Sequence, residues 1–189
     1  MTVEVRRLRT EDIPDALRIS LKELGEDYLA EDDFIHASEN GQFCNVVLYD
    51  GKVAGFAICR EFGPKEEPEV LGLPDGSFRD EVLSCSRSGI LDSVSMDDSF
   101  KGKGLGSILC RRCYDDMVAD GCQLICAMAW KSYTGRTNIA GILTKLGLEE
   151  GLAIQGYWNR MVSSPEGHHC PECGAPCKCY GVFWRKKIV

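Results

Sequence analysis

The sequence predicts an α/β fold in the broad sense (α+β), with a mixed sheet of six or seven strands and helices on both faces. Three observations predict it. Two apolar strands within 43–62 flank Asp50-Gly51, a pair that favours the positive φ angles of a tight hairpin turn. A strand at 89–96, a glycine-opened helix and a continuous apolar run at 122–130 indicate a central parallel pair. Strand and helix patterns alternate along much of the chain, without an internal repeat.

The first elements follow from periodicity and helix-cap residues. Residues 3–8 alternate as a strand does, and 9–24 carry one apolar helical face with Asp12 as the expected cap. The acidic stretch 25–41 predicts a second short helix that ends near Gly41. Prolines and glycines at 63–89 predict an irregular excursion over the surface, for which a plain connector is the simplest reading.

The later elements complete the sheet. The glycine-opened helix extends to about Ala119, and 134–148 predicts another helix that Gly147 closes. Residues 153–162 and 180–188 predict two late strands that flank a cysteine cluster. A chain of 189 residues suits one domain, here 1–189.

Composition and charge exclude several classes of protein. The net charge of -7 argues against broad nucleic-acid binding, which needs a basic face. The amino-terminal residues carry no apolar stretch suited to a signal peptide, and the longest apolar run is too short to span a bilayer. We therefore expect a cytoplasmic protein without membrane contacts.

The sequence contains 11 cysteines. Because nothing in the sequence indicates export, we expect a reducing environment in which they do not form disulfides. Four of them crowd into ten residues near the end and need a separate explanation. The others lie among apolar residues, and we expect them to be small buried hydrophobic side chains. They are Cys44, Cys59, Cys85, Cys110, Cys113, Cys122 and Cys126.

The stretch SFKGKGLGSILCRRC, residues 99–113, places three alternate glycines at the start of a helix. Backbone amides at a helix start lack intrahelical partners and carry the positive end of the dipole, so those of Gly102 to Gly106 predict a diphosphate site. Lys101 and Lys103 would supply mobile countercharge. The spacing fits neither a Walker loop nor the dinucleotide fingerprint, and a plain tight turn is the alternative.

These residues resemble the acetyl-CoA site of the GNAT superfamily of N-acetyltransferases. The resemblance rests on a strand ending in VSMDDSF, followed by the loop at 101–106, a helix and a buried strand. In addition, KLGL at 145–148 resembles the end of the family's fourth helix. Lys101 stands where the family usually has Arg or Gln, which keeps the charge but loses the planar guanidinium. The resemblance implies a mostly antiparallel sheet that splays at its parallel pair, where coenzyme A binds. It implies a cofactor-binding set of Val94, Ser95, Met96, Lys101, Gly102, Lys103, Gly104, Leu105, Gly106 and Asn138, in which Asn138 could instead cap a helix.

The resemblance implies direct transfer of acetyl from the thioester to a neutral amine, which needs a base. Asp92 is the candidate, because it lies on the strand leading to Val94 and shares the side-chain parity of Met96; a solvent-facing position is the alternative. The resemblance also implies a tyrosine that protonates the leaving thiolate, but its position falls near Leu143. Leucine cannot donate a proton. Tyr133 is the candidate replacement. Ser132, water or an unassisted thiolate are the alternatives.

The segment HHCPECGAPCKC, residues 168–179, predicts a zinc knuckle inserted between the last two strands. Its expected ligands are Cys170, Cys173, Cys177 and Cys179, with His168 or His169 as a possible substitute. Four thiolates would close the coordination shell, so a structural Zn²⁺ is expected. The family resemblance implies that this loop lies beside the acceptor site, and we expect the metal to stiffen a loop that shapes the acceptor pocket. The cysteine spacing matches neither common ferredoxin pattern, which disfavours an iron–sulfur cluster. Free thiols without a metal are the alternative.

The resemblance as a whole implies an acetyl-CoA-dependent N-acetyltransferase acting on a primary amine of a small molecule or protein. A non-catalytic acyl-CoA sensor, or a scaffold whose zinc loop docks a partner, is the alternative. A zinc-dependent hydrolase is disfavoured because there is no spaced histidine pair. The acidic segment EDYLAEDD, residues 26–33, favours a cationic acceptor, with a plain solvent-facing charge run as the alternative. The oligomeric state stays open, with a dimer among the options.

Overall fold

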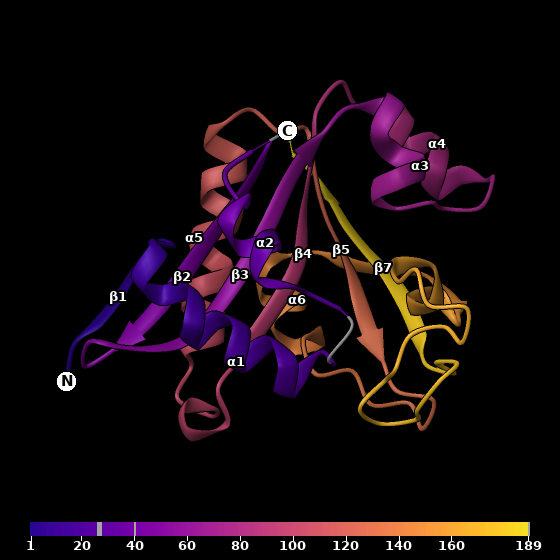
Figure 1. The fold of residues 1–189 in the computed structure, drawn as a ribbon. Helices are drawn as coiled ribbons and strands as arrows, with labels where there is room; N and C mark the ends of the chain where they lie inside the picture. The colour runs from indigo at the N-terminus through magenta and orange to yellow at the C-terminus, as the bar shows by residue number, and fades with distance from the viewer. Residues whose placement is uncertain (26–27, 40, 189) are drawn as a thin grey trace.

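Seven strands form one sheet in the order β1-β2-β3-β4-β5-β7-β6 in the computed structural model, which describes residues 1–25, 28–39 and 41–188 (Figure 1). Every neighbouring pair is antiparallel except β4 and β5, which are parallel. The predicted fold class is therefore confirmed. The strands are β1 (Val3–Arg7), β2 (Gln42–Tyr49), β3 (Lys52–Phe62), β4 (Ser88–Met96), β5 (Leu124–Lys131), β6 (Glu149–Gln155) and β7 (Tyr180–Lys187).

Helices cover both faces of the sheet because successive side chains of β3 point to opposite sides. Phe56 and Ile58 pack in the core under α1 and α2, whereas Ala57 and Cys59 pack in the core under α5 and α6. Figure 1 shows α1 and α2 in front of the sheet and α5 behind it, with α3 and α4 beside the upper end of β3. The helices are α1 (Ile13–Glu23), α2 (Glu31–Ile35), α3 (Glu67–Val70), α4 (Ser77–Leu83), α5 (Leu105–Ala119) and α6 (Ala140–Leu146).

The hairpin turn and the buried cysteines are as predicted. Asp50 and Gly51 both have positive φ, 48° and 77°, as the turn between β2 and β3 requires. The seven scattered cysteines are all buried, and none of the 11, every one of which is described, forms a disulfide. Within the described ranges, no helix is both long and apolar enough to cross a membrane.

Four local expectations need correction. The excursion at 63–89 is more regular than expected, because it contains α3 and α4 and its last residues begin β4. The strand expected at 153–162 instead spans 149–155, where it pairs with β7, and Tyr157–Met161 form a 3₁₀ helix after Gly156 with φ 68°. In the region 134–148 the helix begins at Ala140. Within 25–41, α2 ends at Ile35; residues 26, 27 and 40 lie outside the described residues.

Asp12 does not cap α1 through its side chain. Its carboxylate instead accepts the backbone amide of Arg9 at 2.8 Å and pairs with the Arg6 guanidinium at 2.5 Å. Since Asp12 is almost fully buried, these hydrogen bonds offset the cost of its desolvation. The residue therefore ties the end of β1 to the start of α1.

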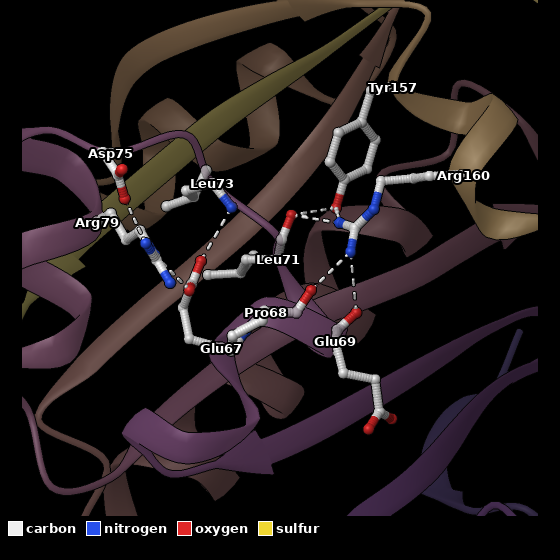
Figure 2. Close-up of polar contacts among 9 residues, drawn as sticks. All are labelled: Glu67, Pro68, Glu69, Leu71, Leu73, Asp75, Arg79, Tyr157 and Arg160. Carbon is white, nitrogen blue, oxygen red and sulfur yellow. Dashed lines mark hydrogen bonds and ion pairs between the residues drawn. The ribbon is translucent and has the colours of Figure 1, made fainter.

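A buried carboxylate organises the α3–α4 excursion (Figure 2). Glu67 has no exposed surface, accepts the Leu73 amide at 2.9 Å and pairs with Arg79 Nε at 2.8 Å. On the other side of α3, the Arg160 guanidinium donates to the carbonyls of Leu71 and Pro68 at 2.5 and 2.7 Å. The excursion is thereby fixed to the 3₁₀ helix that follows β6.

Arg79→Met is expected to lower the free energy of unfolding by about 2 kcal/mol, because it leaves the buried Glu67 carboxylate without its charged partner. Urea denaturation measures the effect. The double variant with Glu67→Gln should recover much of the loss, since a neutral amide costs less to bury. Equal stability of Arg79→Met and the wild type would contradict this account.

Candidate functional site

A cleft of about 1150 Å³ opens where β4 and β5 stop pairing. The last paired residues are Leu91 and Ala127, and beyond them the two strands line opposite walls. The loop before α5, the start of α6 and the segment that contains Cys170 complete the lining. This volume exceeds the roughly 300–1,000 Å³ of ordinary small-molecule sites. The cleft can therefore hold an extended ligand.

A β-bulge in β4 places Asp92 at this cleft. Ile58 pairs with Ser93 and Cys59 with Leu91, so Asp92 has no partner residue on β3. The extra residue changes the alternation of side chains along the strand. Asp92 interacts electrostatically with the buried Tyr157 and Cys126 on one face of the sheet.

Met96 packs on the opposite face, in the core under α5, as do Leu91 and Val94. The expectation that Asp92 and Met96 share one side-chain direction is therefore wrong, because the bulge between them shifts the parity. Both side chains nevertheless line the cleft, which passes between the diverging strands.

The loop at 101–106, here called the glycine loop, contains backbone N–H groups without hydrogen-bond acceptors in the described part of the chain. Among the described residues, the amides of Gly102 to Gly106 have no intramolecular acceptor. Gly102 and Gly104 both have φ of 78°, a left-handed conformation that an L side chain rarely adopts. Gly104 is also the N-cap residue of α5. These amides form a concave donor set at the positive end of the helix dipole, which suits an anion.

The amides of Val94 and Met96 point toward the gap between the strands. Asp97 donates its amide to Ala54 on β3 at 2.9 Å, and successive amides of a strand alternate in direction. Those of Met96 and Val94 therefore point away from β3. Ser95 also lines the cleft, and its buried hydroxyl has no hydrogen-bond partner among the described residues.

The two loop lysines differ in their surroundings. Lys101 lines the cleft and pairs with Glu23 at 2.5 Å and with Asp98 at 2.6 Å. Hydrogen bonds from Lys101 and Lys22 lower the pKa of Asp98 to about 2. Lys103 is exposed, outside the cleft lining, with its ammonium 5.4 Å from the centre of the Tyr49 ring. Lys101 is therefore the better placed of the two to meet a ligand.

The Asp92 carboxylate lies in a weakly solvated part of the cleft. Desolvation raises the pKa of Asp92 to about 6, although the Arg60 charge opposes the rise. Among the described residues it makes no hydrogen bond or ion pair within contact distance. A carboxylate with such a pKa can accept a proton near neutral pH.

Tyr28, which the sequence analysis did not single out, lies beside Asp92. Burial and the Asp92 charge raise the pKa of Tyr28, so its hydroxyl stays protonated. Its ring centre lies 6.1 Å from that of Trp158 and 5.6 Å from that of His168, both in edge-on contacts. Tyr28 stands in a polar, acidic stretch of sequence without periodicity, so no pattern marked it.

Two residues expected at the site, the candidate proton donor Tyr133 and the candidate cofactor ligand Asn138, lie at different places. Tyr133 is 54% exposed and does not line the cleft, and its backbone amide faces the Cys179 sulfur. Leu143, where the family's tyrosine was expected, is fully buried. Asn138 lines the cleft just before α6. The structure therefore brings Asp92, Asn138 and the loop together, and leaves Tyr133 outside.

The four cysteines between β6 and β7 gather their sulfur atoms within 4.8 Å of one another. Cys170 Sγ and Cys179 Sγ are 3.9 Å apart, and Cys173 Sγ lies 3.9 Å from Cys177 Sγ and 3.6 Å from Cys179 Sγ. Tetrahedral Zn²⁺ with Zn–S bonds of about 2.3 Å requires sulfur separations of about 3.8 Å. The cluster therefore has the dimensions of a four-thiolate metal site.

A scan of protein families matches residues 4–137 to the acetyltransferase (GNAT) family. Curated proteins gave no significant match. Among solved structures, the ribosomal-protein-S18-alanine N-acetyltransferase from Escherichia coli is similar, with 16% identity, a TM-score of 0.66 and coverage of 99% of this chain and 94% of that chain.

Two further structures have the same fold. Ard1 from Thermoplasma volcanium is 12% identical with a TM-score of 0.67, covering 100% of this chain and 99% of that chain. The Drosophila melanogaster polyamine N-acetyltransferase is 13% identical with a TM-score of 0.63, covering 99% and 100%. At these identities the structures show the fold alone. Because the family match spans well over half of the 189 residues, the chain belongs to the GNAT family of acetyltransferases.

Proposed function

We propose that the protein transfers an acetyl group from acetyl-CoA directly to a primary amine of a small molecule or protein. One observation carries the proposal: the unsatisfied amides of Gly102 to Gly106 lie at the same cleft as the Asp92 carboxylate. The amides and Lys101 would hold the diphosphate. The amides of Val94 and Met96 and the Ser95 hydroxyl would hold the pantetheine arm and the thioester carbonyl, with Asn138 at the other wall.

Asp92 acts as the general base in this scheme. Its carboxylate takes one proton from the bound ammonium, and the neutral nitrogen attacks the thioester carbonyl carbon. The amide donors of β4 stabilise the negative charge that develops on the carbonyl oxygen. As the C–S bond breaks, the departing thiolate takes the second amine proton, and Asp92 returns the first to solvent. No protein acid is needed, which fits the position of Tyr133 outside the cleft.

We further propose that Cys170, Cys173, Cys177 and Cys179 bind one structural Zn²⁺ in a knuckle at 168–179. The sulfur separations support this assignment, and four thiolates leave no open position for water. The Lys178 amide donates to Cys173 Sγ at 3.2 Å, as an amide beside a metal-bound thiolate would. A reducing, cytoplasmic setting, which we also propose, keeps these thiols from forming disulfides.

Calorimetric titration with acetyl-CoA and a thiol-release assay with an amine panel test the proposal. Binding with release of coenzyme A supports it. Binding without release from any amine, peptides included, would instead identify an acyl-CoA sensor. An absence of binding would refute the assignment of the glycine loop.

Gly104→Ala is expected to weaken acetyl-CoA binding roughly tenfold, because a φ of 78° costs an alanine about 1–2 kcal/mol and relaxation would turn the loop amides away. A Cβ at this position meets nothing within 4 Å, so the effect is conformational and not steric. Calorimetry measures it. Gly141→Ala, also free of neighbours and with ordinary helical backbone, is the control and should bind normally. Equal affinity of both variants would contradict the role of the loop.

A further inference from the structure

The charges that line the cleft are paired, with one exception. Lys22 pairs with Asp98 at 2.6 Å, and Lys101 pairs with Glu23. At another wall, Arg136 pairs with Glu172 at 3.4 Å. Among the described lining residues, Asp92 is the carboxylate without a hydrogen bond or ion pair. The uncompensated charge of the described cleft is therefore negative, which favours a cation beside Asp92.

Aromatic rings line the same cleft as this carboxylate, and the Asp92 charge acts on one of them, Tyr28. Tyr28, Trp158 and Trp130 all line the cleft, and Tyr28 and Trp158 are in edge-on contact. The face of an aromatic ring attracts a cation, most strongly where water is excluded. An ammonium group beside Asp92 would thus meet a carboxylate and ring faces together.

The position of Trp158 is fixed by the excursion in Figure 2. Its ring makes an edge-on contact with Tyr157 at 5.1 Å, and Trp158 Nε1 donates to the Tyr180 carbonyl at 3.2 Å. The Tyr157 hydroxyl donates to the Leu71 carbonyl at 2.9 Å, the same oxygen that Arg160 binds. Trp158 is therefore held in place without a ligand.

The same contacts narrow access to Asp92. Tyr28 follows α1, whereas Trp158 and His168 precede the cysteine cluster, so their ring contacts join two segments far apart in the sequence. The Arg136–Glu172 pair joins the connection after β5 to the cysteine segment. Such a partly enclosed pocket admits a slender chain more readily than a folded protein surface.

Resting on the proposed function, we propose that the acceptor is an alkyl primary amine with no carboxylate beside the reacting nitrogen, held between Asp92 and the rings of Tyr28 and Trp158. A carboxylate on the adjacent carbon would lie close to Asp92. The lysines and the arginine of the described cleft lining are paired, and Arg60, whose charge reaches Asp92, is paired with Glu66 and Glu69. Like charges in a weakly solvated site repel, so α-amino acids should be excluded. A peptide amine would need the narrow side of the pocket to open.

Butylamine, norvaline and norvalinamide test the acceptor class, because the last two add a carboxylate or a neutral amide to the same amine. We expect kcat/KM for butylamine to exceed that for norvaline by at least about tenfold, with norvalinamide between them. A peptide that begins with norvaline should be a poor acceptor. Equal rates for butylamine and norvaline, or a better rate with the peptide, would overturn the inference. Release of thiol from no amine would instead refute the proposed function.

Ring variants test the pocket wall. Trp158→Leu and Tyr28→Leu should each raise KM for butylamine roughly tenfold, with the dissociation constant of acetyl-CoA unchanged. Trp158→Phe and Tyr28→Phe keep a ring and should stay close to the wild type. Acetyl-CoA binding confirms that a variant is folded. If Trp158→Leu does not bind acetyl-CoA, the comparison of Tyr28→Leu with Tyr28→Phe tests the assignment, because Tyr28 is less buried than Trp158. An unchanged KM in a folded leucine variant would overturn the assignment.

Discussion

Asp92→Asn is expected to lower kcat by roughly 10²–10⁴-fold, the contribution typical of a positioned general base. The amide keeps the size of the side chain but cannot accept the amine proton. Acetyl-CoA binding should be retained, because the proposed diphosphate contacts come from the backbone at 102–106. Thiol release under saturating substrate, together with calorimetry, separates the two effects.

The pH dependence provides an independent measurement of the same group. With the pKa of Asp92 near 6, the carboxylate is ionised above that pH, so kcat/KM should fall tenfold per pH unit well below 6 and lose this dependence in the variant. The free energy of unfolding depends on pH in the opposite direction to the activity. A raised pKa favours the folded protein below about pH 4 and this contribution is lost as the pH rises through 6. Asp92→Asn should therefore be at least as stable as the wild type at pH 8.

Asp80→Asn is the matched control, since Asp80 is exposed on α4 and does not line the cleft. It should keep the wild-type rate and pH profile. A folded Asp92→Asn protein with wild-type turnover would remove Asp92 from the mechanism. A slow variant that has also lost acetyl-CoA binding would point to a structural role.

Replacing Cys170 and Cys173 together by serine is expected to remove the bound zinc and to lower the free energy of unfolding by at least about 3 kcal/mol, because metal binding contributes directly to folding. For a chain of this size, such a loss corresponds to a fall in Tm of roughly 6–12 °C. Metal analysis and thermal denaturation measure both. We expect KM for the amine to rise more than the dissociation constant of acetyl-CoA, since Cys170 lines the cleft but is not part of the glycine loop proposed to hold the diphosphate.

Cys85→Ser is the control for the loss of a thiol, because Cys85 is buried but lies outside the cluster. It should keep one metal ion per chain. Full metal content in the double variant, with normal amine KM, would refute both the site and its effect on the acceptor pocket. Chelation of the wild-type protein should reproduce the fall in Tm.

Local chemistry made the main elements and the glycine loop predictable. Asp50-Gly51 needs positive φ wherever it closes a hairpin, and alternate glycines before an apolar helix expose amides in any surrounding fold. The cysteine cluster was also predictable, because all of its candidate metal ligands lie within the 12 residues of 168–179. Each of these signals is contained in one short segment.

The remaining features depend on contacts between distant segments. The bulge at Asp92 arises from its register with β3, and no residue of β4 marks it. Tyr28 meets Trp158 and His168 only after both segments fold over the sheet. The helices α3 and α4 are short and depend on the buried Glu67, whose partners come from elsewhere in the excursion. Periodicity cannot reveal such tertiary arrangements.

Lys101 has a consequence for the strength of cosubstrate binding. Its ammonium already has two carboxylate neighbours, one on α1 and one in its own loop. An incoming diphosphate gains this cation only to the extent that Glu23 and Asp98 give it up. The attraction is therefore an exchange of ionic partners, and its net free energy is smaller than the sum of the new contacts.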